Sequence, residues 1–297
     1  MNYENVFAKA LMDMANYTKG INDEFTNGVS SGFRSLDRYL GGLKGGSFTV
    51  IAGRSAVGKT SLAISMAVNM TFGENPISVL FYSFEHSRKS IVERVMAGKG
   101  GIDISRLEKG SLTSEEDASF KETNDLLFSR RYGFYLTDDA SLNLYDLCCS
   151  IKTITQSHPT EIVFIDGINL IRNEKHDLPE FAWMTEVSRE IKLLARELDI
   201  PIVCSCYINR EGGKERAPML ADLRDCGLIE HFADNILLID NSTIRQLYNS
   251  LPRTDDGTEL QVDLNLRKII VAKNQNGFTG AFNMKFNPSR CCFTEAK

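Results

Sequence analysis

The stretch Gly53-Arg54-Ser55-Ala56-Val57-Gly58-Lys59-Thr60 fits the pattern G-x-x-x-x-G-K-[ST] at every position. An apolar run over 47–52 leads into it, and a run with helical spacing over 61–67 follows it. Glycines let the backbone fold closely around phosphate oxygens, and the N–H groups at the start of a helix point toward negative charge. The stretch therefore predicts a phosphate-binding loop between a strand and a helix. The alternative is an ordinary glycine-rich turn.

Two side chains of this loop have expected roles in holding a nucleotide. Lys59 is expected to reach the β- and γ-phosphates, and the hydroxyl of Thr60 is expected to hold Mg²⁺. The residues expected to surround the phosphates are Gly53, Ser55, Ala56, Val57, Gly58, Lys59 and Thr60. The predicted cofactors are therefore ATP and Mg²⁺.

The composition suits a globular protein with one large domain or two small ones. The chain has 297 residues, of which 42% are hydrophobic and 25% are charged. No apolar run approaches the roughly 20 residues that a membrane span requires, and the first residues lack the features of a signal peptide. The seven cysteines include no C-x-x-C pair, and Cys204 and Cys206 lie in an apolar run. We therefore expect reduced, mostly packed cysteines in a cytoplasmic protein that does not contact a membrane.

The net charge of −5 bears on contact with nucleic acid. It argues against a protein that coats DNA or RNA with its whole surface. A few basic loops on an acidic protein can still hold DNA, so the net charge does not exclude DNA as a partner.

From residue 33 onward, apolar strands alternate with helical patterns. This alternation predicts an α/β fold with a largely parallel twisted sheet flanked by helices. The expected strands are 47–52, 78–84, 133–137, 161–166, 200–206, 235–240 and 267–273. The expected helices are 59–71, 87–98, 114–129, 143–157 and 180–198. A hairpin or mobile loop is expected over 242–262.

The segment before residue 33 has a different pattern. Phe7, Ala10, Leu11 and Met14 recur at helical spacing, which predicts a short amphipathic helix over 3–18 within an N-terminal segment at 1–19. Its apolar face could pack on its own domain or on a neighbouring subunit. The polar, glycine-bearing stretch at 20–32 is predicted to be a linker, followed by one domain over 33–297.

Two strands end in carboxylates that suit nucleotide hydrolysis. The run Ile162-Val163-Phe164-Ile165-Asp166 has the Walker B form, so Asp166 is expected to share Mg²⁺ with Thr60, although it could merely cap a turn. Glu85 follows the apolar run 79–84 and is the candidate catalytic base, although a surface glutamate opening the next helix fits equally well. A polar corner at Asn209 and Arg210 follows the third core strand. It could sense the γ-phosphate, contact a neighbour or form a surface loop.

In combination, these residues resemble the C-terminal RecA-like ATPase domain of DnaB-type hexameric replicative helicases. The resemblance covers about residues 20–297 and rests on motifs that occur in the family's order. Ser31 to Asp37 resembles the motif that opens the domain, Tyr82 to Ser87 the motif with the catalytic glutamate, and Ala272 to Gly280 the subunit-interface motif. Pro218 to Glu230 is the most diagnostic stretch, because it resembles the DNA-contacting loop and the helix after it.

The resemblance implies a ring, usually of six identical subunits, with ATP bound between subunits and single-stranded DNA in the centre. A primase or a loader is a further partner, and the segment at 3–18 corresponds in place to the helix that docks on the next subunit. Lys273 would act in trans as a catalytic residue in the neighbour's site, beside Glu85 and Lys59 of that site. The DNA-contacting residues would be Arg210, Arg224, Asp225, Cys226 and Gly227. Such backbone contacts carry little sequence specificity and weaken with salt.

Three features depart from the family pattern. The family normally has a further N-terminal domain, so this chain is expected to be either a piece of a longer protein or a natural single-domain relative. Tyr207 stands where a glutamine is common after the third strand, and Gln275 stands at the position of the trans-acting arginine finger. Because glutamine cannot supply the positive charge of a finger, we expect slow hydrolysis with nucleotide binding intact.

The motifs favour an ATP-driven helicase motor that translocates on single-stranded DNA in replication. A second hypothesis is a DNA- or partner-regulated ATP switch with weak hydrolysis, which Tyr207, Gln275 and the missing domain favour. A recombinase-type filament is a third, and the loop around Asp222-Leu223-Arg224 argues against it.

Overall fold

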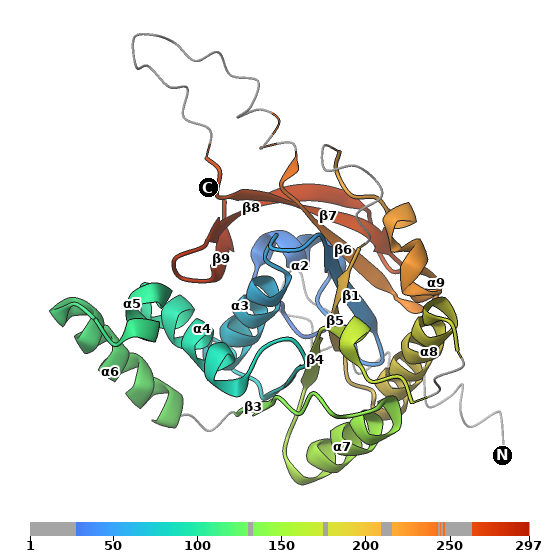
Figure 1. Cartoon of the computed structure of the whole chain (residues 1–297), viewed down its shortest axis with the longest axis horizontal. Helices are drawn as coiled ribbons and strands as arrows, with labels where there is room; N and C mark the ends of the chain where they lie inside the picture. The colour runs from blue at the N-terminus through green and yellow to red at the C-terminus, as the bar shows by residue number, and fades with distance from the viewer. Residues whose placement is uncertain are drawn as a thin grey trace, which may run out of the picture.

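The computed structural model describes residues 28–129, 133–174, 178–208, 216–242, 244, 246 and 263–296. The helix predicted over 3–18, the corner at Asn209 and Arg210, and most of the loop predicted over 242–262 lie outside these residues. Within them, nine strands form a single sheet in the order β3-β2-β4-β5-β1-β6-β7-β8-β9. Figure 1 shows this sheet running through the molecule with helices on both sides.

The first six strands of that order are parallel, as the sequence predicts. Their central members are buried along their whole length, because helices cover both faces of a parallel sheet. Their bounds are β3 Phe134–Thr137, β2 Val79–Ser83, β4 Ile162–Asp166, β5 Ile202–Tyr207, β1 Phe48–Gly53 and β6 Asn235–Asp240.

Three antiparallel strands extend the sheet beyond β6. They are β7 Leu266–Asn274, β8 Gly280–Asn287 and β9 Cys292–Glu295. The sequence predicted β7 but not β8 or β9. A signal for β8 was present, because Phe282, Met284 and Phe286 alternate with polar residues, which is typical of a strand with one packed face.

The helices bury two hydrophobic cores, one on each face of the sheet. Alternate side chains of a strand point to opposite faces, so Phe48 and Val50 of β1 join one core while Ile51 joins the other. One core includes residues of α7 (Leu144–Ser157) and α8 (Glu180–Leu198). The other includes residues of α2 (Arg34–Leu40), α3 (Lys59–Phe72) and α4 (Arg88–Gly100). The remaining helices are α5 Ile104–Lys109, α6 Ser114–Ser129, α9 Ile229–Phe232 and the 3-10 turns η1 Ile168–Leu170 and η2 Leu220–Cys226.

The five predicted helices occur within two residues of their expected ends, whereas α2, α5 and α9 were not predicted. All three are short, with seven, six and four residues, so they carry too few turns for a periodic pattern to stand out.

Residues 28–32 belong to the domain and not to a linker. Val29 and Leu43 exchange two backbone hydrogen bonds of 2.9 and 2.7 Å. The N–H of Ser31 donates to the carboxylate of Asp37 at 2.8 Å, and Ser31 is fully buried. The predicted linker over 20–32 is therefore wrong at its carboxyl end.

None of the seven cysteines, all of which lie in described segments, forms a disulfide; Cys204, Cys206 and Cys226 are buried and the other four are partly buried. Across the part of the chain that the structure describes, no helix has the length and apolar character to cross a bilayer.

Candidate nucleotide-binding site

The phosphate-binding pattern lies where the sequence predicts, between the end of β1 and the start of α3. Two of its residues adopt left-handed backbone, Ala56 with φ 61° and Gly58 with φ 108°. A side chain at Gly58 would lie 2.8 Å from the ring of Phe293, so only glycine fits there. The loop therefore packs tightly against β9 where α3 begins. Its backbone is folded as a close approach to phosphate requires.

Thr60 and Asp166 meet at the base of this loop. The hydroxyl of Thr60 donates to both carboxylate oxygens of Asp166, at 2.9 and 3.1 Å. Ser205 of β5 donates to the same carboxylate at 2.6 Å, and its oxygen accepts the N–H of Gly167 at 2.7 Å. Asp166 is 1% exposed, and burial raises its pKa. The site thus holds a desolvated acid that a cation would stabilise.

Glu85 lies beside Asp166, as expected for two carboxylates at the same edge of the sheet. Ser83 of β2 pairs with Asp166 of β4, and Glu85 follows two residues later. Potential ligand atoms of Glu85, His86 and Asp166 all lie within 4.8 Å of one another. Of these groups, Glu85, Asp166 and the Thr60 hydroxyl offer the hard oxygen ligands that Mg²⁺ prefers, whereas His86 offers a nitrogen. The donor set therefore fits Mg²⁺.

Lys59 is buried at the first turn of α3, with 5% of its surface exposed. Its ammonium donates to the carbonyl of Arg54 at 3.1 Å and lies 3.9 Å from the centroid of the Tyr207 ring. Burial lowers the pKa of Lys59, while the carboxylates of Glu85 and Asp166 act in the opposite direction. A phosphate would supply the negative charge that this ammonium needs.

Tyr207 connects the groups of the site. It pairs with Gly53 across β1 and β5, so its ring lies against the phosphate-binding loop. Burial raises the pKa of Tyr207 above the usual range for a phenol, and the negative charge of Glu85 acts in the same direction. Its N–H donates to Asn169 at 2.9 Å, and its carbonyl accepts from the Cys226 thiol at 3.0 Å.

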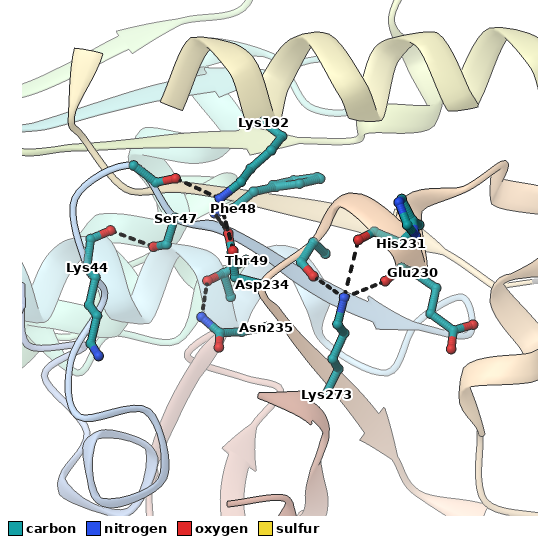
Figure 2. A network of polar contacts seen from close by, with 12 residues as sticks. Lys44, Ser47, Phe48, Thr49, Lys192, Glu230, His231, Asp234, Asn235 and Lys273 are labelled. Carbon is teal, nitrogen blue, oxygen red and sulfur yellow. Dashed lines mark hydrogen bonds and ion pairs between the residues drawn. The ribbon is translucent and has the colours of Figure 1, made fainter. Parts of the chain in front are cut away.

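Lys273 lies near the amino ends of the parallel strands, whereas the phosphate-binding loop lies at their carboxyl ends. Its ammonium donates to the carbonyls of Glu230, His231 and Ala233, at 2.8, 3.4 and 2.6 Å (Figure 2). These carbonyls end α9, just before β6 begins, whereas the loop follows the carboxyl end of β1, which is parallel to β6. Lys273 therefore cannot serve the phosphate site of its own subunit, and in this structure it caps α9.

The strand that carries Lys273 is irregular at this point. The pairing of β6 with β7 shifts between Ile236 and Leu237, so one extra residue of β7 bulges opposite them. Gln275, two residues after Lys273, donates its N–H to the Asp234 carbonyl at 3.0 Å, and the Gln275 side chain is exposed. The position that the resemblance assigns to the finger is thus held by a backbone hydrogen bond, and it presents a neutral amide to solvent.

The predicted DNA loop is the turn η2 and its flanks. Arg216 is paired with Asp222 through two contacts of 2.9 and 2.5 Å, and the carbonyl of Arg216 accepts from Arg54 of the phosphate-binding loop at 2.9 Å. The Cys226 side chain is buried against Cys206 and Tyr207, so only its backbone could reach DNA. Arg210 and the side chains of Arg224 and Asp225 lie outside the described residues.

Gly227 is required by packing. It has φ 67°, and a side chain there would lie 2.5 Å from the backbone nitrogen of Thr185 in α8. This contact holds the end of η2 against α8, independently of any contact with DNA.

The structure therefore brings together the loop residues from Gly53 to Thr60, Asp166 and Glu85, and keeps Lys273 apart from them. The sequence analysis missed Ser205 and Asn169. Ser205 could have been found, because it is a polar residue near the carboxyl end of an apolar strand. Asn169 has no such signal, since its bond to Tyr207 depends on how η1 packs against β5.

The chain matches the family model described as the DnaB-like helicase C-terminal domain over residues 28–295. The chain belongs to this family. The match starts at the first residue that the structure describes and includes every site residue discussed above.

Curated relatives of this DnaB-like domain are longer than it is. It is 31% identical over 294 residues to a probable plasmid replicative DNA helicase of Chlamydia muridarum. The aligned region covers 98% of this chain and 60% of that protein. It is 29% identical over 285 residues to the replicative DNA helicase DnaB of Helicobacter pylori, covering 88% of this chain and 58% of that protein. The chain thus spans about 60% of the length of such relatives.

Solved structures resemble the DnaB-like domain over nearly all of its length. One of them, an isolated ATPase domain, is 25% identical, with a TM-score of 0.83 and 98% of each chain covered. A DnaB-like replicative helicase, solved to study its interactions with primase, is 25% identical, with a TM-score of 0.81 and coverage of 97% of this chain and 66% of that one. The RecA-like ATPase fold predicted from the sequence is confirmed.

Proposed function

We propose that this domain is the ATP-driven motor of a replicative DNA helicase and acts on single-stranded DNA in the cytoplasm. The observation that carries the proposal is the convergence of Lys59, Thr60, Asp166 and Glu85 at the carboxyl edge of the sheet in a DnaB-like chain. Relatives named replicative DNA helicases support the reaction class.

The residues of the site have separate tasks in ATP hydrolysis. The N–H groups at the start of α3 and the Lys59 ammonium bind the phosphates. Thr60 and Asp166 would hold Mg²⁺, which supplies positive charge to the phosphate oxygens when bound. Glu85 orients the attacking water and accepts its proton, because its carboxylate lies at the same edge as Asp166.

The rest of the motor comes from neighbouring subunits. Lys273 acts in trans on the phosphates of the next subunit. Its place at the amino ends of the parallel strands, away from the phosphate-binding loop of its own subunit, supports this role. The chain would therefore assemble into a closed ring of identical subunits, six in the family that it resembles. The loop at η2 would hold the DNA backbone, and a primase or a loader would join the whole protein.

The second candidate is an ATP switch with weak hydrolysis. It is favoured by the exposed neutral amide of Gln275 at the finger position and by the Tyr207 ring against the Lys59 ammonium. Both features slow the chemical step without removing the phosphate-binding loop.

An unwinding assay on a forked duplex separates the two functions. The motor predicts ATP-dependent strand separation that Lys59→Ala abolishes, together with DNA-stimulated ATP turnover. A wild-type protein that binds ATP and DNA but separates no strands would reject the motor and favour the switch. Electron microscopy with single-stranded DNA and a non-hydrolysable ATP analogue would distinguish a ring from a filament.

A further inference from the structure

His86 adds a nitrogen to the oxygen ligands at the carboxyl edge of the sheet. One candidate ligand atom each of Glu85, His86 and Asp166 lies within 4.8 Å of the other two. Mg²⁺ prefers oxygen ligands, whereas imidazole nitrogen suits transition metals such as Zn²⁺. The magnesium role of the site therefore does not account for His86, and the mixed ligand set points to a different ion.

The backbone of His86 is held beside Asp166. Ser83, the last residue of β2, pairs with Asp166 of β4. The hydroxyl of Ser83 accepts the N–H of His86 at 3.1 Å and donates to the His86 carbonyl at 2.7 Å. The next residue, Ser87, is the N-cap of α4, and its hydroxyl accepts the N–H of Ser90 at 3.3 Å. His86 thus sits in a turn that is fixed at both ends.

The two carboxylates of the cluster differ in freedom. Asp166 is 1% exposed and accepts from the hydroxyls of Thr60 and Ser205, which orient it as the outer partners of metal ligands do. A carboxylate has about four lone-pair positions, so two hydroxyls leave room for an ion. Ligand atoms around tetrahedral Zn²⁺ lie about 3.3 Å apart, given bonds of about 2.0 Å. The exposed Glu85 side chain can rotate to close that difference.

We propose that Glu85, His86 and Asp166 bind one Zn²⁺ ion in the subunit without nucleotide. Zn²⁺ accepts imidazole nitrogen and carboxylate oxygen together, and three protein ligands leave a fourth position for water. Two negative carboxylates, one of them deeply buried, gain from a shared cation.

Zinc binding has a consequence for ATP hydrolysis, and this consequence rests on the proposed function. Zn²⁺ on the Glu85 carboxylate takes the lone pairs that would accept a proton from the attacking water. It also occupies Asp166, which the Mg²⁺ of Mg²⁺–ATP would need. Zn²⁺ should therefore inhibit ATP turnover in excess Mg²⁺, and the inhibiting concentration should be about tenfold or more higher for His86→Gln.

Equilibrium dialysis of the full chain against buffered Zn²⁺, without nucleotide, tests the site itself. His86→Gln should weaken the Kd for Zn²⁺ about ten- to hundredfold, and Glu85→Gln repeats the test at a second ligand. His158→Gln is the matched control, because His158 is exposed and follows the end of α7. It should leave the Kd unchanged.

Two further measurements identify the ligands and their surroundings. Co²⁺ takes the same ligands as Zn²⁺, and its absorption should lack the intense ultraviolet band that a thiolate ligand adds. Burial lowers the pKa of Lys59, whereas Glu85 and Asp166 act in the opposite direction, so the ammonium and these carboxylates interact. Lys59→Ala should therefore tighten Zn²⁺ binding while it abolishes ATP binding, because a positive charge that repels the ion is removed.

The outcomes are distinct. Equal Zn²⁺ affinity of wild type and His86→Gln would show that the imidazole is not a ligand, and the inference would be wrong. A thiolate band from Co²⁺ would place the ion on cysteines and would also reject it. If Mg²⁺–ATP binds normally and Zn²⁺ does not bind, this inference alone fails. If Zn²⁺ binds as expected and Mg²⁺–ATP does not bind, the proposed function fails and the zinc site stands.

Discussion

The hydroxyl of Thr60 donates to both carboxylate oxygens of Asp166, at 2.9 and 3.1 Å, so the first turn of α3 is tied to the end of β4. This contact joins the two expected ligands of Mg²⁺ by direct hydrogen bonds. It also buries an acid whose pKa is raised by burial, which means that the charged form of Asp166 is costly in the free domain.

Asp166→Asn should therefore separate stability from function. Asparagine removes the buried charge and keeps an oxygen that accepts from Thr60 and Ser205. We expect the Tm without nucleotide to stay equal or rise, and the Tm increase caused by ATP with Mg²⁺ to disappear. Thermal unfolding at pH 7 with and without ATP and Mg²⁺ measures both. A variant with a normal response to ATP and Mg²⁺ would show that Asp166 does not hold the metal.

Glu85→Gln should remove turnover and keep binding. The amide has nearly the shape of the carboxylate but cannot accept a proton, so kcat should fall about 10²- to 10⁴-fold. The Kd for ATP should stay within a few-fold of wild type, whereas Lys59→Ala should lose binding. Single-turnover hydrolysis and equilibrium binding measure the two effects. Turnover near the wild-type rate would return Glu85 to the role of a surface residue that opens α4.

Much of this site follows from the sequence, because parallel strands end at one edge of the sheet. Apolar runs that end in Asp166 and Glu85 were enough to place both carboxylates near the phosphate-binding loop. The contact of Tyr207 with Lys59 was not predictable in the same way. It depends on the register that sets Gly53 opposite Tyr207, and register is a property of the folded sheet.

The cap that Lys273 forms on α9 was also beyond sequence analysis. Helix α9 has four residues and no periodic signal, and the side chain of Lys273 is set by a bulge in β7. The family resemblance assigned Lys273 a role in a neighbouring subunit, while the structure adds three carbonyl partners within its own. Lys273 must leave some of these carbonyls to reach a phosphate.

A trans role for Lys273 predicts complementation between two inactive variants. Lys59→Ala removes the phosphate contact within a subunit, and Lys273→Ala removes the contact across the interface. In rings mixed at equal amounts, about one interface in four joins an intact Lys59 to an intact Lys273. ATP turnover of the mixture should therefore exceed that of either variant alone. A mixture no more active than its parts would place Lys273 in a purely structural role at α9.

Gln275→Arg should accelerate hydrolysis by supplying the missing charge at the interface. An arginine finger can contribute about 10³- to 10⁵-fold, and a single replacement on an existing hairpin should recover about tenfold or more. Asn276→Arg is the matched control, because it adds the same charge to the neighbouring exposed position. DNA-stimulated turnover measures the effect. A fast wild type that Gln275→Arg does not accelerate would reject slow hydrolysis as a property of this chain.

Glu116 lies away from the nucleotide site, and its contribution to the stability of the folded protein depends on pH. The N–H of Thr113 is the main cause that lowers its pKa from 4.5 to about 2, and the N–H of Asp103 and the Arg106 guanidinium act in the same direction. A carboxyl with a lowered folded pKa stabilises the protein above its unfolded pKa and loses that effect as pH falls toward the folded value.

Glu116→Gln should therefore lower the Tm at pH 7, and the difference from wild type should shrink as pH falls below about 4.5. Glu122→Gln, at an exposed position of the same helix α6, is the control and should leave the Tm unchanged at every pH. Thermal unfolding between pH 7 and pH 3 measures both variants. A Tm difference for Glu116→Gln that is constant over this range would show that its effect comes from packing, because the loss of a charge contact must follow the protonation of the acid.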